Sequence, residues 1–213
     1  MTLKCKVIQS TRADLKVVLA DTRSLFFRYI NGMTTKQHIV AFLLAFAVLS
    51  VGASSSLAAA ACPDRNRPAV SNADTRWRAS LLCMTNHQRT VHHLHTLKLS
   101  KQLASGAQKY AAQMVSQHFF AHQSPAGVQL ESRIRATGYL RGMNLWGVGE
   151  NIYATGMPTQ TPAQAMAAWM SSPHHQENIL DPSWREFGAG IVRSMPSTPQ
   201  GWTMTQWFAI RQR

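Results

Sequence analysis

The sequence predicts an α+β fold in which helices and short strands occupy separate stretches of one domain. Apolar residues recur at helical spacing through the first half of the region after residue 74. From Leu145 onward the sequence contains glycines and residues that favour β-strands. No repeat or low-complexity tract appears after residue 62. The hydrophobic content of 45% excludes a mainly disordered chain.

Each element is predicted from its caps and from the spacing of its apolar residues. Ser100 and the pair Thr161–Pro162 are helix starts, and Gly138 and Pro173 are helix ends. The predicted helices cover residues 75–91, about 100–117, about 128–137 and 162–172. The predicted strands cover residues 145–154, 187–193 and 202–210. In the last of these, Trp202, Met204, Gln206 and Phe208 share one face.

The N-terminal region has the pattern of a secretory signal peptide. Residues 39–61 are 23 uncharged, mostly apolar positions that end in small residues. The 38 residues ahead of them are long for the basic leader, so we expect translation to start at Met33, residues 33–61 to be the signal peptide and residues 1–32 not to be made. Two alternatives remain open, an uncleaved signal anchor that spans the membrane and a lipid attached to Cys62. Residues 62–76 are then a polar lead-in to a folded domain of residues 77–213.

The charge balance is strongly basic, with 22 Lys and Arg against 9 Asp and Glu and a net charge of +13. Residues 62–213 keep 15 of the basic and 7 of the acidic residues, a net charge of +8, and no run of four basic residues occurs among them. Nucleic-acid-binding modules show a clustered basic patch or a recognisable motif. We therefore expect no nucleic-acid partner.

Cysteine usage agrees with export. Removal of residues 1–61 leaves Cys62 and Cys83, and a bridge between them would close a loop of roughly 20 residues in an oxidising compartment. The alternative is two free, buried thiols.

Three ionisable side chains that each lie next to a turn are candidates for a shared site: His122, Glu150 and His175. Two imidazoles and a carboxylate are the ligands of an open zinc site that keeps one position for water. Spacing alone does not show that the three side chains converge. The alternative is that each is separately hydrogen-bonded within the protein or exposed to solvent. A second histidine group, His92, His93 and His95, cannot face one way on a helix and is interpreted as a solvated edge.

The stretch from about Leu81 to Phe208 resembles the CAP superfamily of SCP-like domains, in its short secreted bacterial form. The resemblance rests on six segments in a fixed order: LLCMTNHQR (81–89), FFAHQSPAG (119–127), RIRATGY (133–139), GVGENI (147–152), AAWMSSPHHQENIL (167–180) and FGAGI (187–191). It implies an α-β-α sandwich with a small antiparallel sheet between helical layers. Asn86 and Arg89 match a family segment and are expected to be structural.

The resemblance also implies a cleft in which two histidines and two acids bind a divalent cation, zinc above all. His122 and His175 match the histidines, and Glu150 matches the glutamate of the GEN motif. The second acid falls at Ser172, which is not a charged ligand, so we expect the metal to be held weakly. His174 and Glu177 either add a ligand or lie on the surface.

The sequence thus predicts a monomeric protein, secreted or held in the cell envelope, that acts by binding. The expected ligands are the cation in the cleft and a lipid, sterol or cell-envelope component. The alternative is a metal-assisted hydrolase of envelope or peptide substrates, with Glu150 as its catalytic residue beside a metal-bound water. Membrane association is expected only if residues 39–61 stay uncleaved.

Overall fold

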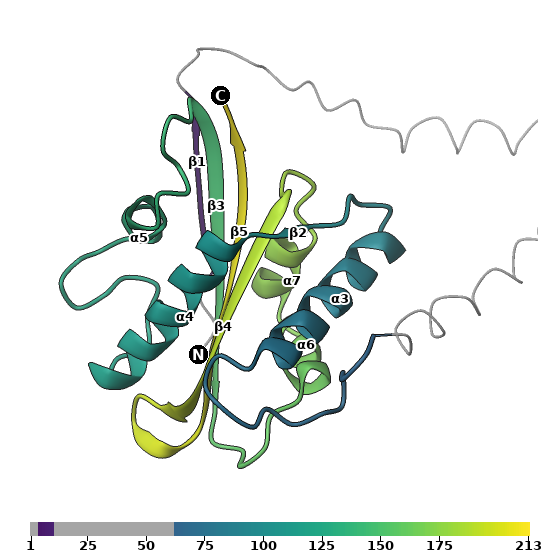
Figure 1. Ribbon diagram of the computed structural model, residues 1–213, viewed down its shortest axis with the longest axis vertical. Helices are drawn as coiled ribbons and strands as arrows, with labels where there is room; N and C mark the ends of the chain where they lie inside the picture. The colour runs from purple at the N-terminus through teal and green to yellow at the C-terminus, as the bar shows by residue number, and fades with distance from the viewer. Residues whose placement is uncertain (1–3, 11–61) are drawn as a thin grey trace, which may run out of the picture. The chain divides into compact units, whose positions relative to one another are not determined.

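A single five-stranded sheet runs through the centre of the molecule (Figure 1). The structure, a computed structural model, describes residues 4–10 and 62–213. The strands are β1 (Lys4–Ser10), β2 (Lys98–Leu99), β3 (Leu145–Thr155), β4 (Glu186–Met195) and β5 (Thr198–Gln212), in the sheet order β1-β3-β5-β4-β2. All neighbours are antiparallel except β2, which runs parallel to β4.

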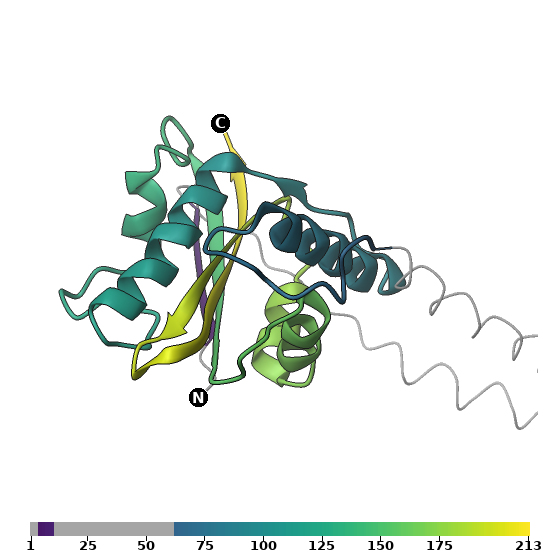
Figure 2. The ribbon, with the colours of Figure 1, turned by 60° about the horizontal axis from the view of Figure 1, so that its bottom comes forward.

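Helices cover both faces of this sheet. They are α3 (Thr75–Val91), α4 (Lys101–Ser116), α5 (Leu130–Ala136), α6 (Pro162–Met170) and α7 (Pro173–Ile179). Helices α4 and α5 lie against one face, and α3, α6 and α7 lie against the other (Figures 1 and 2). The α-β-α sandwich predicted from the sequence is therefore confirmed.

The caps predicted from the sequence are present. The Ser100 hydroxyl accepts a hydrogen bond from the Leu103 amide at the start of α4. Thr161 and Gln164 form a reciprocal capping box at the start of α6. These side chains satisfy backbone amides that the first turn of a helix leaves without partners, so the local sequence fixes where both helices begin.

The core consists of two apolar clusters, one on each face of the sheet. Alternation along β5 supplies both clusters, because Trp207 packs with α4 and α5 whereas Phe208 packs with α3, α6 and α7. Two glycines of β4 let α4 approach the sheet closely. A Cβ atom at Gly188 would lie 2.3 Å from the amide nitrogen of Ala104, and one at Gly190 would lie 2.6 Å from the carbonyl carbon of Ala107. The FGAGI segment is thus a contact surface for a helix.

The structure differs from the sequence prediction at three places. The sheet is mixed, because Lys98 and Leu99 pair in parallel with the start of β4 through hydrogen bonds of the Lys98 and Ser100 amides. Pro173, predicted to end a helix, instead begins a separate helix, α7, because the first helical turn needs no amide proton at that position. Residues 4–10, expected to lie outside the domain, form strand β1, paired with β3.

A disulfide joins Cys62 to Cys83, as the sequence predicted. The bond ties the lead-in to helix α3. Asp74 anchors the same junction, because its carboxylate caps α3 through the amides of Arg76 and Trp77 and forms an ion pair with Arg67. The lead-in is therefore fixed to the domain at both of its ends.

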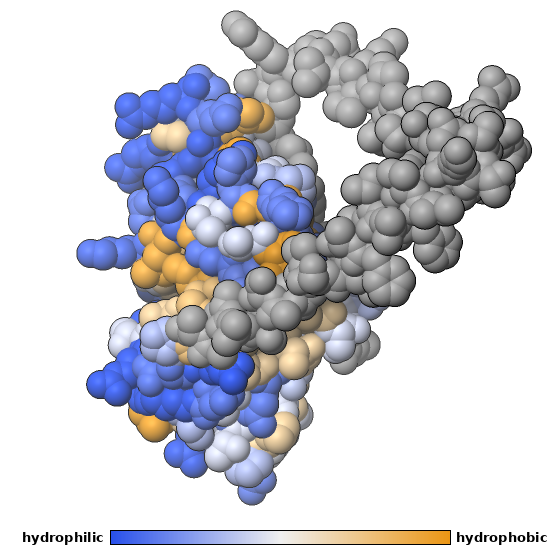
Figure 3. Space-filling view, turned by 90° about the vertical axis from the view of Figure 1, so that its right-hand side faces the viewer, coloured by the Kyte–Doolittle hydropathy of each residue, from blue (hydrophilic) through white to orange (hydrophobic). Residues whose placement is uncertain are grey.

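The predicted signal peptide, residues 33–61, lies outside the described residues. Among the residues that the structure describes, no helix has the length and apolar character needed to cross a bilayer. On the face shown in Figure 3, a band of hydrophobic residues lies between hydrophilic regions. Large hydrophobic side chains that are exposed occur at separate points of the described chain: Val70, Val91, Leu99, Val128 and Met157.

Candidate functional site

Glu150 is a fully buried carboxylate in the middle of β3, and three side chains donate hydrogen bonds to it. His122 Nδ1 lies 2.7 Å from Oε1, and Arg133 Nη2 lies 3.0 Å from the same oxygen. Trp207 Nε1 donates to Oε2 over 2.7 Å. The carboxylate is thus satisfied inside the protein by one imidazole, one guanidinium and one indole.

Each of these donors comes from a different element. Trp207 stands directly opposite Glu150 in the β3–β5 ladder. Arg133 reaches the carboxylate from α5, and His122 comes from the loop after α4. The Tyr110 hydroxyl fixes that loop by donating a 2.6 Å hydrogen bond to the carbonyl oxygen of Ala121.

His175, on α7, is the second histidine of the predicted site and is 3% exposed. Neither of its ring nitrogens has a hydrogen-bonding partner among the described residues. Burial lowers the pKa of His175 from 6.5 to about 4, and a smaller electrostatic contribution from nearby His122 acts in the same direction. The His175 imidazole is therefore neutral at pH 7, with a donor and an acceptor left for a ligand.

A buried amide network holds α7 against β3. The Asn151 side chain donates to the His175 carbonyl oxygen over 3.2 Å and to Gln206 Oε1 over 3.1 Å. Asn178 in turn donates to Asn151 Oδ1 over 3.0 Å. The GEN and ENIL segments of the sequence are thus connected side chain to side chain, which positions His175 beside the strand that carries Glu150.

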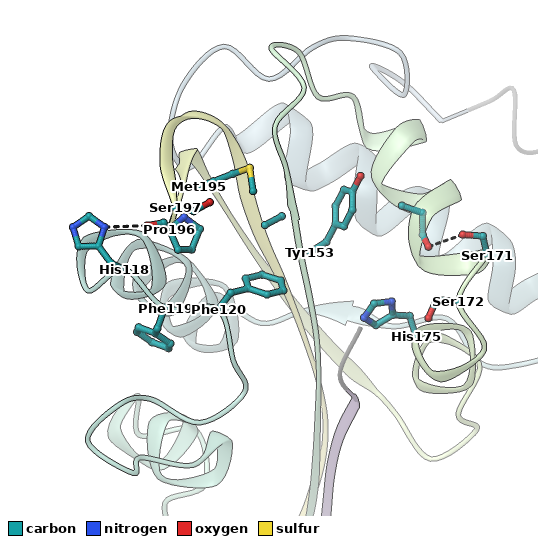
Figure 4. Close-up of a pocket in the computed structure, with 12 residues that line it drawn as sticks. His118, Phe119, Phe120, Tyr153, Ser171, Ser172, His175, Met195, Pro196 and Ser197 are labelled. Atoms are coloured by element: carbon teal, nitrogen blue, oxygen red, sulfur yellow. Dashed lines mark hydrogen bonds between the residues drawn. The ribbon is translucent and has the colours of Figure 1, made fainter. Parts of the chain in front are cut away.

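A cavity of about 550 Å³ adjoins His175. Its lining includes Phe119, Phe120 and Tyr153. Figure 4 shows Phe120 and His175 on opposite sides of the cavity, with Tyr153 between them. Residues 171–172, after α6, and residues 195–197, in the β4–β5 turn, complete much of the lining. His118 ties the turn to α4, since its Nδ1 lies 2.9 Å from the Pro196 carbonyl oxygen.

The residues around Glu150 do not fit the divalent cation that the resemblance implied. Within residues 4–10 and 62–213, no group of three or more His, Cys, Asp or Glu side chains is arranged to hold a metal ion. Both oxygens of Glu150 already accept hydrogen bonds, and one of the donors is the permanently charged Arg133. A cation that approached Glu150 would meet the fixed positive charge of Arg133 on the same carboxylate.

The other candidate residues named from the sequence lie partly in the cavity and partly on the surface. Ser172, at the position expected for a second acid, lines the cavity together with His175. His174 and Glu177 are exposed on α7, and the group His92, His93 and His95 is exposed after α3. The structure thus brings His122 and Glu150 into direct contact and places His175 near them.

Sequence reasoning does not assign a role to Arg133 or to the indole of Trp207 at Glu150. Arg133 belongs to the RIRATGY segment, and Trp207 is expected in the core or a cleft wall. Their contact with Glu150 depends on strand register and on how α5 docks, and no local pattern encodes either of these. The only sequence signal for these contacts is an acidic residue in a segment predicted to be a buried strand, because a buried carboxylate requires a hydrogen-bonding partner from another part of the chain.

Comparison with known proteins gives one family match. The sequence model of the CAP family, described as the cysteine-rich secretory protein family, matches residues 82–205. A curated relative, the Bacillus subtilis (strain 168) protein named "Uncharacterized protein YkwD", is 32% identical over 111 residues. That region is 52% of this chain and 40% of the relative, so the chain spans less than half of the relative's length.

Two solved structures share the fold. One is an extracellular protein containing an SCP domain from Bacillus anthracis str. Ames, with a TM-score of 0.52 and 27% identity over 63% of this chain and 40% of that one. The other is an outer surface protein from Borrelia burgdorferi, with a TM-score of 0.52 and 20% identity over 62% of this chain and 90% of that one. The second likeness concerns the fold alone.

Proposed function

The chain belongs to the CAP, or cysteine-rich secretory protein, family, and on that premise we propose that it is an exported binding protein whose cavity beside His175 takes a partly apolar ligand. The observation that carries the proposal is the pairing of an aromatic cavity of about 550 Å³ with a buried imidazole whose nitrogens have no partner in the described chain. Cavities of this size and lining are typical of small-molecule sites.

The lining defines the class of ligand. Phe120 and Tyr153 supply aromatic walls, whereas neutral His175 supplies one donor and one acceptor. A molecule with an apolar body and a single hydroxyl, carbonyl or carboxyl group satisfies both features. Lipids and sterols have this chemistry, and they are the ligands we propose.

Export is supported by the disulfide and by a relative. A bond between Cys62 and Cys83 persists in an oxidising compartment. The Bacillus anthracis structure at 27% identity is titled an extracellular protein. We expect the protein recovered from culture fluid to begin at residue 61 or 62, and therefore to lack strand β1, which N-terminal sequencing tests. A retained 39–61 segment would instead indicate an anchor.

Binding is favoured over metal-assisted hydrolysis by the state of Glu150. The hydrolase would need a metal-bound water beside that carboxylate, and three hydrogen-bond donors already occupy it. The cavity beside His175 needs no such rearrangement to accept a ligand.

Calorimetric titration of the folded protein with oleic acid and with cholesterol in detergent tests the proposal. We expect saturable binding of at least one of these probes, weakened about tenfold or more in Phe120→Ala and Tyr153→Ala. Val70→Ala is the matched control, because Val70 is 67% exposed and does not line the cavity. Binding that the two cavity variants leave unchanged, or no binding of either probe, would overturn the proposed ligand class.

A further inference from the structure

Arg133 brings a permanent positive charge to Glu150, in the cleft that the family resemblance assigns to His122, Glu150 and His175. Its side chain is only 8% exposed, and its Nη2 lies 3.0 Å from Oε1 of the fully buried Glu150. We infer that Arg133 is the resident cation of this cleft, in the electrostatic place that the family resemblance gave to a divalent metal. The inference concerns cations alone and goes beyond the ligand of the cavity beside His175.

The guanidinium is held in place by aromatic rings. Its central carbon lies 3.2 Å from the centroid of the Tyr110 ring and 5.8 Å from the Trp207 ring. A guanidinium is planar and weakly hydrated, so it stacks on aromatic faces and tolerates burial better than an ammonium group does. Arg133 is therefore fixed before any ligand arrives, and its charge stays in the cleft.

The geometry of Glu150 matches a hydrogen-bond acceptor and not a metal ligand. In a tetrahedral zinc site with bonds of about 2.0–2.1 Å, an imidazole nitrogen and a carboxylate oxygen lie about 3.3 Å apart. The corresponding distance between His122 Nδ1 and Glu150 Oε1 is 2.7 Å, a direct hydrogen bond. His122 Nδ1 and Glu150 Oε1 are thus bonded to each other and do not both face one metal ion, whereas His122 Nε2 is not part of this hydrogen bond.

The charges of the cleft balance without a metal. A site with two acids offers two negative charges to a divalent ion, but this chain has Ser172 at the second acid position. One carboxylate, Glu150, is left, and the single positive charge of Arg133 matches it. A divalent ion placed there would meet one neutralised carboxylate and the repulsion of a fixed guanidinium.

Zinc titration of the folded protein, followed by calorimetry and by the NMR signals of the His122 and His175 rings, tests this inference. We expect no zinc binding in the cleft of the unaltered protein. Arg133→Gln removes the charge and keeps hydrogen-bonding capacity, so it should gain zinc binding at least about tenfold tighter than the upper limit set by the unaltered protein. Arg133→Lys keeps a positive charge and should still bind no zinc in the cleft, although it should be less stable because an ammonium group is costlier to bury. Arg135→Gln is the matched control, since Arg135 is a half-exposed arginine of the same helix that pairs with Glu131.

Two results would overturn the inference. The first is zinc binding by the unaltered protein that both His122→Ala and His175→Ala abolish, and this measurement decides the question even where an Arg133 variant does not fold. The second is a folded Arg133→Gln protein whose zinc affinity equals that of the unaltered protein.

Discussion

Arg89, in the last turn of α3, donates a 2.7 Å hydrogen bond to the carbonyl oxygen of Ile179, the last residue of α7. The same guanidinium donates to the carbonyl oxygens of His95 at 2.8 Å and Asp181 at 2.9 Å. Arg89 is fully buried, and this burial lowers its pKa to about 10. One side chain therefore closes the C-terminal end of the helix that carries His175.

Replacement of Arg89 by Met should destabilise the protein by about 3 kcal/mol or more, because it leaves several carbonyl oxygens without a donor at about 1–3 kcal/mol each. Urea denaturation measures the loss. Arg76→Met, at an exposed position of the same helix, should change the free energy of unfolding by no more than about 0.5 kcal/mol. Equal losses in the two variants would mean that the Arg89 contacts contribute nothing specific.

Replacement of Glu150 by Gln should be similarly costly, at about 3–5 kcal/mol, because it leaves the buried Arg133 charge without its counter-ion. The matched control is Glu131→Gln. Glu131 pairs with Arg135 across an exposed helix surface, so its loss should cost less than about 1 kcal/mol. Denaturation curves of both variants at neutral pH give the comparison, and a stable, cooperative Glu150→Gln protein would refute the idea that this charge pair must stay matched.

The fold was largely accessible from the sequence because its signals are local. Ser100, Thr161 and Pro162 mark helix starts through hydrogen bonds or φ angles that act within one turn. Strand β2 could not be predicted from the sequence, because two residues are too few to show a periodicity and they pair only because β4 lies beside them. Helix α7 was missed for a related reason, as Pro173 reads as a stop although it also suits a first helical turn.

The candidate site was only partly accessible. His122, Glu150 and His175 were named from their residue types and from a family resemblance, and the first two are in direct contact. The chemistry of the contact was different from the expectation, because Arg133 enters it from α5. An arginine on an amphipathic helix ordinarily faces water, and no feature of RIRATGY distinguishes the buried Arg133 from the half-exposed Arg135.

Reduction of the Cys62–Cys83 disulfide should lower stability without unfolding the sheet. The two cysteines are 21 residues apart, and a loop of this length corresponds to about 3 kcal/mol in the chain-entropy account. Thermal melts of the Cys62→Ser/Cys83→Ser double variant should therefore show a lower Tm with an unchanged far-ultraviolet spectrum. A Tm equal to that of the oxidised protein would show that the lead-in stays anchored without the bond, through Asp74 and Arg67.

His175 should make stability fall as the pH falls from about 6.5 to about 4. Its pKa is 6.5 in an unfolded chain and about 4 in the folded protein, where burial disfavours the charged ring. Between these values the unfolded chain binds more protons, so the free energy of unfolding rises with pH and the full contribution, about 3 kcal/mol, is present above pH 6.5.

Urea denaturation between pH 4 and pH 7.5 measures this dependence, and His175→Gln should flatten it because glutamine does not titrate. His174→Gln is the matched control, since His174 is the exposed neighbour on the same helix and its replacement should leave the slope in place. Because other groups of the protein also contribute to the total slope, the difference between the two variants, and not the total slope, isolates His175. Identical slopes in His175→Gln and in the unaltered protein would mean that the ring is protonated in the folded state and that α7 opens to admit water.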